Sequence, residues 1–245
     1  MYPARLLKHE IKGRAVFMKS ERRYISMKKY DTKRIVTLGM LAAIAYVACA
    51  VIHIHVVSFL SYEPKDVILL ITGLLFGPVD ALIVTVLVCL VEFMTISSTG
   101  PIGLLMNVIS SASFAVTAGM IYQKIRTLKG AIVSVGVGVV VMTCIMMVWN
   151  YLITPLYQGV PREVVAGMLI PVFLPFNLIK GFLNAGITLL LYKPVVMTLR
   201  QAKLVPGENT RTKGSFNKNS ILMIALSVLL IATAVLWLLA INGKL

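Results

Sequence analysis

One lysine lies within a long apolar run in the second half of the chain, and two asparagines flank it. Asn177, Lys180 and Asn184 are spaced i, i+3 and i+7, so a helix places all three on one face. An ammonium and two amides are costly against lipid, so this face is expected to turn toward a cavity or to join helices by hydrogen bonds. Because an amide both donates and accepts, such a set suits a flat heterocycle rich in carbonyls and ring nitrogens.

Acidic residues border two other apolar runs and are candidates for the same site. Asp66 follows Tyr62 by four residues at the expected start of a helix, where capping of that helix is its simplest role and the rim of a cavity its functional one. Glu92 lies near the end of the same long apolar stretch. It is expected either at the solvated rim or in a cavity, since ionisable groups at membrane depth are commonly functional.

Two further asparagines complete the candidate set. Asn150 lies beside Tyr151 near the end of one run, and Asn107 lies near the start of another. The alternative role of Asn150 is hydrogen bonding between helices, and that of Asn107 is initiation of a helix. Tyr62, Trp149 and Tyr151 are candidates for the apolar or stacking walls of a pocket.

Signatures of metal sites and of enzymes are absent from the sequence. The three cysteines, Cys49, Cys89 and Cys144, lie far apart within apolar runs and form no CxxC or Cys/His pattern, so no metal site is predicted. The sequence contains no GxxxxGK[ST], HExxH or GxSxG motif. Any work driven by ATP would therefore need another chain.

The composition is that of an integral membrane protein. Of the 245 residues, 58% are hydrophobic and only 13% are charged, against about 25% charged residues in ordinary soluble domains. A soluble enzyme, a disordered chain and a disulfide scaffold are thereby excluded. The net charge of +15 is typical of cytoplasmic loops rather than of nucleic-acid binding.

The apolar runs predict an all-α fold. They cover roughly residues 35–57, 67–97, 104–122, 130–157, 169–192 and 220–241. The second run is too long for one simple span and contains Gly77-Pro78, so we expect two helices hinged there. The first of them, about residues 66–76, is too short to cross a bilayer core of about 30 Å. Six helices form the expected core, and the last run is an additional C-terminal membrane helix.

Charge supports the hinge at Gly77-Pro78. With two helices in the second run and a cytoplasmic N-terminus, 20 of the 24 Lys and Arg residues fall on the cytoplasmic side. The C-terminus is then expected outside. The predicted organisation is a basic cytoplasmic tail (1–34), a six-helix core (35–199), a basic cytoplasmic linker (200–219) and an extra membrane segment (220–245).

The first apolar run is rich in small residues. Gly39 and Ala43 form a small-xxx-small pair, which lets helices approach closely. The pair serves either internal packing or a docking face for another membrane subunit.

About two-thirds of the chain, residues 33–199, resembles the substrate-binding S-components of energy-coupling factor (ECF) vitamin transporters, most closely their riboflavin-specific members. The segments that carry the resemblance are Gly39-Met40-Leu41-Ala42-Ala43, Asp66-Val67 with Leu74-Leu75-Phe76-Gly77-Pro78, Gly100-Pro101 through Met106-Asn107 to Ser111-Ala112-Ser113-Phe114, Trp149-Asn150-Tyr151 with Pro155-Leu156-Tyr157, and Pro175-Phe176-Asn177-Leu178-Ile179-Lys180-Gly181 ending at Leu191-Tyr192-Lys193. The basic N-terminus and the run at 220–241 depart from the family pattern.

The resemblance implies a capture subunit that binds riboflavin outside and delivers it inward, without enzymatic activity or a resident cofactor. It implies partners: a transmembrane T-component, which the Gly39/Ala43 face would contact, and two ABC-type ATPases. It also implies that Asn150, Asn177 and Lys180 contact the flavin. Two alternatives stay open from the sequence: an S-component for another vitamin or a flavin analogue, and a membrane enzyme or scaffold that uses Glu92 and Asp66.

Overall fold

The computed structural model describes residues 31–52, 54–57, 60–97 and 99–205, together with isolated positions between 224 and 235. The chain forms two compact units, residues 1–36 and 37–245, and nearly all of the described residues belong to the second unit. Most of the predicted tail (1–34), linker (200–219) and extra segment (220–245) lies outside the described residues.

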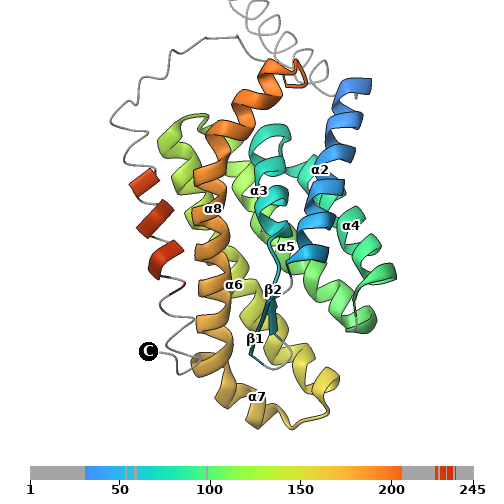
Figure 1. Ribbon diagram of the computed structural model, residues 1–245. Helices are drawn as coiled ribbons and strands as arrows, with labels where there is room; N and C mark the ends of the chain where they lie inside the picture. Colours follow the sequence, from blue (N-terminus) through green and yellow to red (C-terminus); the bar gives the residue numbers. More distant parts are fainter. Residues whose placement is uncertain are drawn as a thin grey trace, which may run out of the picture. The chain divides into compact units, whose positions relative to one another are not determined.

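Helices dominate the described residues (Figure 1). Five segments are long and apolar enough to cross a membrane: Thr32–Val51, Pro78–Thr95, Gly100–Lys124, Leu128–Gln158 and Arg162–Gln201. The first four are helices α2, α4, α5 and α6, and the fifth comprises α7 (Arg162–Met168), the π-helical turn η1 (Leu169–Phe173) and α8 (Leu174–Gln201). The structure therefore gives an α-helical membrane protein with five candidate spans among the described residues.

The predicted break in the second apolar run is confirmed. Helix α3 (Lys65–Phe76) ends at Gly77, whose φ of 101° is open to glycine, and Pro78 begins α4. The Gln123 amide nitrogen lies only 1.9 Å from where a Cβ on Gly77 would be, so a larger side chain would also displace the end of the Gln123 side chain. With 12 residues, α3 is about 18 Å long and stops part-way through a bilayer.

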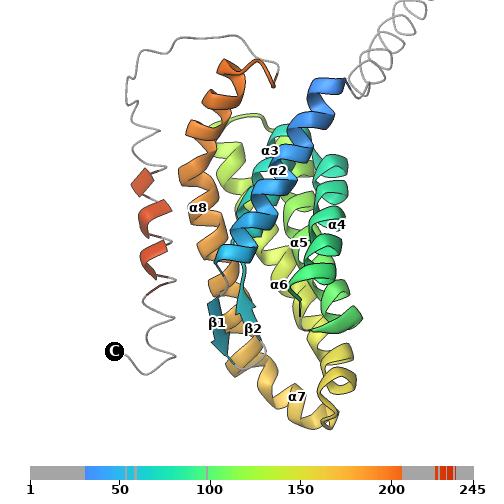
Figure 2. The same ribbon diagram turned by 45° about the vertical axis from the view of Figure 1, so that its right-hand side comes forward.

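A short hairpin follows the first span and corrects the expected extent of that span. Helix α2 ends at Val51 instead of continuing to residue 57, and residues 54–57 form strand β1 (Ile54–Val57). This strand pairs antiparallel with β2 (Leu60–Tyr62). Apolar, β-branched residues fit either a buried helix or a strand, so the hydrophobic pattern alone did not separate the two. Both views place the hairpin toward the same end as α7 (Figure 2).

The short helix α3 lies in the interior of this unit and contacts α4, α5 and α8. Its contact with α5 is close, because a Cβ on Gly73 would come within 2.5 Å of the Ala115 carbonyl oxygen. Leu69 and Leu70 of α3 belong to a core that also contains Phe114 of α5. Since α3 begins in the middle of the bundle, the polar residues of its first turn are surrounded by helices rather than by water.

Candidate ligand-binding site

Residues 62–66 run from the last residue of β2 to the first turn of α3 and form the centre of the candidate site. We refer to them as the 62–66 connector. Four of its five side chains, those of Tyr62, Glu63, Lys65 and Asp66, are buried. Buried charges must be paired, because removing them from water is costly. Within the connector, Tyr62 and Asp66 are bonded to side chains of α8, whereas Lys65 is paired with a side chain of α4.

The Asp66 carboxylate gathers donors from two other helices. Ser111 of α5 donates to Oδ1 at 2.5 Å, and Lys180 of α8 forms an ion pair with Oδ2 at 3.1 Å. Asn184, one turn after Lys180, directs its amide nitrogen to the same oxygen at 3.4 Å. The side chain of Lys180 is only 6% exposed. The polar stripe of α8 thus faces inward, as its spacing predicts, and joins α8 to α3.

Tyr62 ties the hairpin to the same network. Its hydroxyl donates to the Asn184 amide oxygen at 2.8 Å. Burial raises the pKa of the Tyr62 phenol, and the Asp66 carboxylate acts in the same direction, so the phenol keeps its proton at neutral pH. Asn184 therefore uses both ends of its amide, accepting from Tyr62 and donating to Asp66.

A second network surrounds Lys65, whose side chain is 0% exposed. Its ammonium forms ion pairs with Glu63 of the connector and Glu92 of α4. Asn107 of α5 donates to the other Glu92 oxygen at 3.0 Å. Glu92 therefore lies in the interior rather than at a solvated rim, and it links α3, α4 and α5.

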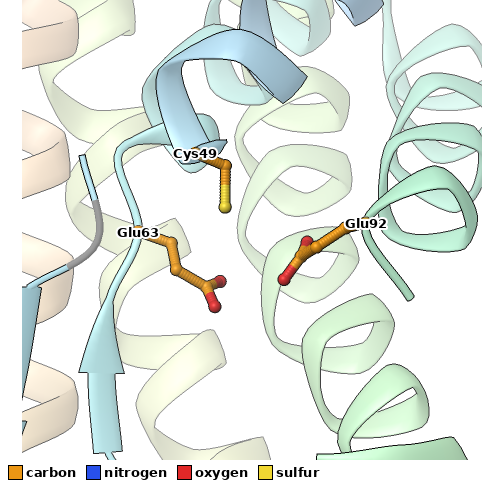
Figure 3. A group of neighbouring side chains, drawn as sticks. All are labelled: Cys49, Glu63 and Glu92. Carbon is orange, nitrogen blue, oxygen red and sulfur yellow. The ribbon is translucent and has the colours of Figure 1, made fainter. Parts of the chain in front are cut away.

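Cys49 of α2 completes a cluster with these two carboxylates. The Cys49 sulfur and carboxylate oxygens of Glu63 and Glu92 lie within 4.8 Å of one another, and the three side chains point toward a common centre (Figure 3). Such a thiol and two carboxylates are a possible metal-ligand set. In this protein Lys65 is paired with both carboxylates, so an ammonium already supplies the positive charge at this place.

Asn177 lies one turn before Lys180 and is buried. Its amide nitrogen donates to the Phe173 carbonyl at 2.7 Å, at the junction of η1 and α8. π-helical turns leave main-chain groups in irregular positions and often occur at functional sites. The amide of Asn177 stabilises this junction through its nitrogen, and its oxygen is chemically able to accept a hydrogen bond.

A partly open pocket lies between the start of α5 and the last turns of α6. Its lining residues are uncharged: Thr99, Ile102, Gly103, Met106, Trp149, Ile153, Thr154 and Tyr157. Thr154 also donates to the Asn150 amide oxygen at 3.1 Å, and Asn150 is buried. Asn107 directly follows the lining residue Met106. The pocket therefore has an apolar wall, suited to a flat ring, and one of its lining residues, Thr154, is bonded to the Asn150 amide.

The residues that line this pocket include none of the eight predicted substrate-binding residues. The Tyr151 side chain is 41% exposed, while its neighbour Asn150 is buried. Trp149, one residue earlier, lines the pocket instead. Of the predicted wall residues, Trp149 is thus the one at this pocket, and a ligand contact by Tyr151 stays a prediction.

Sequence reasoning missed Glu63, Lys65 and Ser111 as members of the site. Glu63 and Lys65 precede the apolar run and therefore resembled a solvated loop. The signal that could have found them is the shortness of α3: a helix too short to span places its first turn inside the protein.

Comparison with known proteins fixes the family. Residues 33–192 match the family described as "ECF transporter, substrate-specific component". The chain belongs to this family. Its members are substrate-binding subunits of transporters, so this S-component is not an enzyme. It is a multi-pass membrane protein, and S-components pair with a T-component and ATPases.

Two curated relatives and one solved structure are matched by this S-component over nearly their whole length. The chain is 29% identical over 193 residues to "Riboflavin transporter RibU" of Staphylococcus aureus (strain TCH60), a match that spans 74% of this chain and 98% of the relative. It is 27% identical over 191 residues to "Riboflavin transporter FmnP" of Bacillus subtilis (strain 168), spanning 70% and 98%. A solved structure described as "Structure and mechanism of the S component of a bacterial ECF transporter" is 32% identical, with a TM-score of 0.57, covering 69% of this chain and 98% of that one.

Proposed function

We propose that this chain is the riboflavin-binding S-component of an ECF transporter. Both curated relatives are described as riboflavin transporters and are covered over 98% of their length. The observation that carries the proposal is the inward polar face of α8 together with the pocket between α5 and α6. These features supply the two elements that a flavin needs: an apolar wall for its ring system and amides and an ammonium for its polar edge.

The proposed roles follow from the hydrogen-bonding capacity of each group. Lys180 has three N–H donors, of which one faces Asp66, so the others can bond a ring carbonyl or a ribityl oxygen. Asn177 and Asn150 pair with the pyrimidine edge or with hydroxyls of the ligand. Trp149 provides an aromatic face at the pocket wall. Asp66 holds Lys180 in place through its ion pair, and Asn184 in turn donates to Asp66.

The experiment that tests this function is a ligand panel measured with the purified S-component. Dissociation constants for riboflavin, for flavin analogues and for unrelated vitamins are determined by calorimetry in detergent. We expect riboflavin to bind and unrelated vitamins to leave the heat of dilution unchanged. Tight binding of another vitamin, with riboflavin silent, contradicts the riboflavin assignment and favours the same architecture with a different substrate.

The Gly39/Ala43 face of α2 is the proposed contact with the T-component. Both residues are exposed, and a Cβ on Gly39 would meet nothing within 4 Å. Their small size is therefore not required by packing against the part of the chain that the structure describes. Small residues on an exposed helix face permit close approach of another membrane helix, which supports a docking face over internal packing.

The proposed orientation has the N-terminus in the cytoplasm and the C-terminus outside. Reporter fusions after Gly130 and after Leu204 are expected to give a cytoplasmic signal, because this orientation places 20 of the 24 Lys and Arg residues on that side. An external signal at either position contradicts it.

A further inference from the structure

We propose that Lys65 is a positioning residue: it fixes the 62–66 connector on α4 and thereby holds Asp66 where it can orient Lys180. The inference deepens the proposed function and rests on it. Among the described residues, the Lys65 ammonium pairs with Glu63 and Glu92 and not with the proposed flavin contacts Asn150, Asn177 and Lys180. It acts through its chain neighbour Asp66, which carries the ion pair with Lys180.

The first argument is the pattern of contacts along the connector. Tyr62 and Asp66 both bond to side chains of α8. Glu63 and Lys65 lie between them and join the Glu92 side of the bundle instead. The connector is thus held from two opposite directions, and its link to α4 passes through the ammonium of Lys65.

The second argument is that the Lys65 ammonium is buried and is therefore not solvated by water. The Lys65 side chain is 0% exposed, and those of Glu63 and Glu92 are 8% and 5% exposed. Two neighbouring carboxylates this far from water repel each other unless a cation lies between them. Without the cation they take up a proton or move apart, and in either case the link that the ammonium makes from the start of α3 to Glu92 of α4 is lost.

The third argument is that the side chains around the Lys65 ammonium are also of the kinds that bind a metal cation. Cys49 adds a sulfur within 4.8 Å of the two carboxylate oxygens. A soft divalent ion such as Cd²⁺ binds thiolate and carboxylate ligands. In a variant that lacks the lysine side chain, such an ion can replace the ammonium as the centre of the cluster. A merely space-filling role of Lys65 does not predict this replacement.

The test compares Lys65→Ala with and without Cd²⁺, measuring both the melting temperature and the riboflavin dissociation constant. We expect Lys65→Ala to bind riboflavin at least about tenfold more weakly. Cd²⁺ is expected to restore both the melting temperature and the affinity. It should restore neither in Lys65→Ala/Cys49→Ser, which lacks the sulfur. Lys124→Met, which removes an exposed lysine at the end of α5, is the control and keeps the parent's affinity.

A second variant decides the case in which Lys65→Ala does not fold. Lys65→Met/Glu92→Gln removes one charge of each sign, so it avoids leaving two buried carboxylates unpaired. We expect it to fold and to bind riboflavin at least about tenfold more weakly, because the link to α4 is gone. Parent-like affinity in this variant, or Cd²⁺ restoring the melting temperature of Lys65→Ala without its affinity, overturns the positioning role.

The two proposals fail in different ways. If the parent chain binds no flavin, the proposed function is wrong. The cation-centred cluster is still tested, because the melting temperature of Lys65→Ala with Cd²⁺ requires no ligand.

Discussion

Replacing Lys180 by methionine is expected to weaken riboflavin binding by roughly 10- to 150-fold. The substitution keeps the length and much of the volume of the side chain but removes a charged donor to a buried polar atom, which is worth roughly 1.5–3 kcal/mol. Titration calorimetry on the purified S-component measures the change. Lys193→Met is the matched control, since it removes an exposed lysine from the same helix and should leave the affinity unchanged.

The ion pair with Asp66 requires one further variant. Lys180→Met alone leaves the Asp66 carboxylate buried without its cation, and such a loss also destabilises the fold. In Asp66→Asn/Lys180→Met both charges are removed, so the melting temperature should recover while the affinity stays low. If the double variant binds riboflavin like the parent, the polar face of α8 serves only to join helices, and the cavity assignment is wrong.

Replacing Gly39 by leucine is expected to abolish riboflavin uptake in cells while leaving the dissociation constant of the purified chain unchanged. Gly39 is exposed, and a Cβ there meets nothing within 4 Å among the described residues, so the added side chain points away from the packed interior. It does prevent a second membrane helix from approaching closely. Uptake of labelled riboflavin and binding in detergent are measured on the same variant.

Gly136→Leu provides the matched control for this experiment. Gly136 lies on α6 and is exposed, and a Cβ added to it would also meet nothing within 4 Å. The Gly136→Leu variant should transport like the parent. Loss of uptake in both variants would indicate a general effect of bulk on a lipid-facing surface, and loss of binding in Gly39→Leu would indicate internal packing.

Local chain chemistry made several elements of the fold predictable. The break between α3 and α4 follows from Gly77-Pro78, because a glycine with positive φ and a proline in the first helical turn act on the backbone directly. The hairpin at 54–62 was not predictable in the same way. Its residues are as apolar as those of α2, and the hydrophobic pattern of so short a segment does not distinguish a strand from a helix.

The sequence predicted which candidate side chains share a face of α8, but not which side chains of other helices they contact. The spacing of Asn177, Lys180 and Asn184 fixed their common face, and all three are buried as expected. Asp66, the partner of Lys180 and Asn184, lies more than a hundred residues earlier, so only the packing of α3 against α8 shows the pairing. Lys65 was overlooked because its charge suggested a solvated loop. Only the structure shows that α3 starts inside the bundle.

The central claim is that the chain captures riboflavin, and the most direct measurement is the visible absorption of the protein as it is purified from cells supplied with the vitamin. We predict a yellow protein that carries one flavin per chain, identified as riboflavin by mass spectrometry after release, and a colourless Lys180→Met variant prepared in parallel. A folded, colourless parent chain that also fails to quench riboflavin fluorescence on titration contradicts the account.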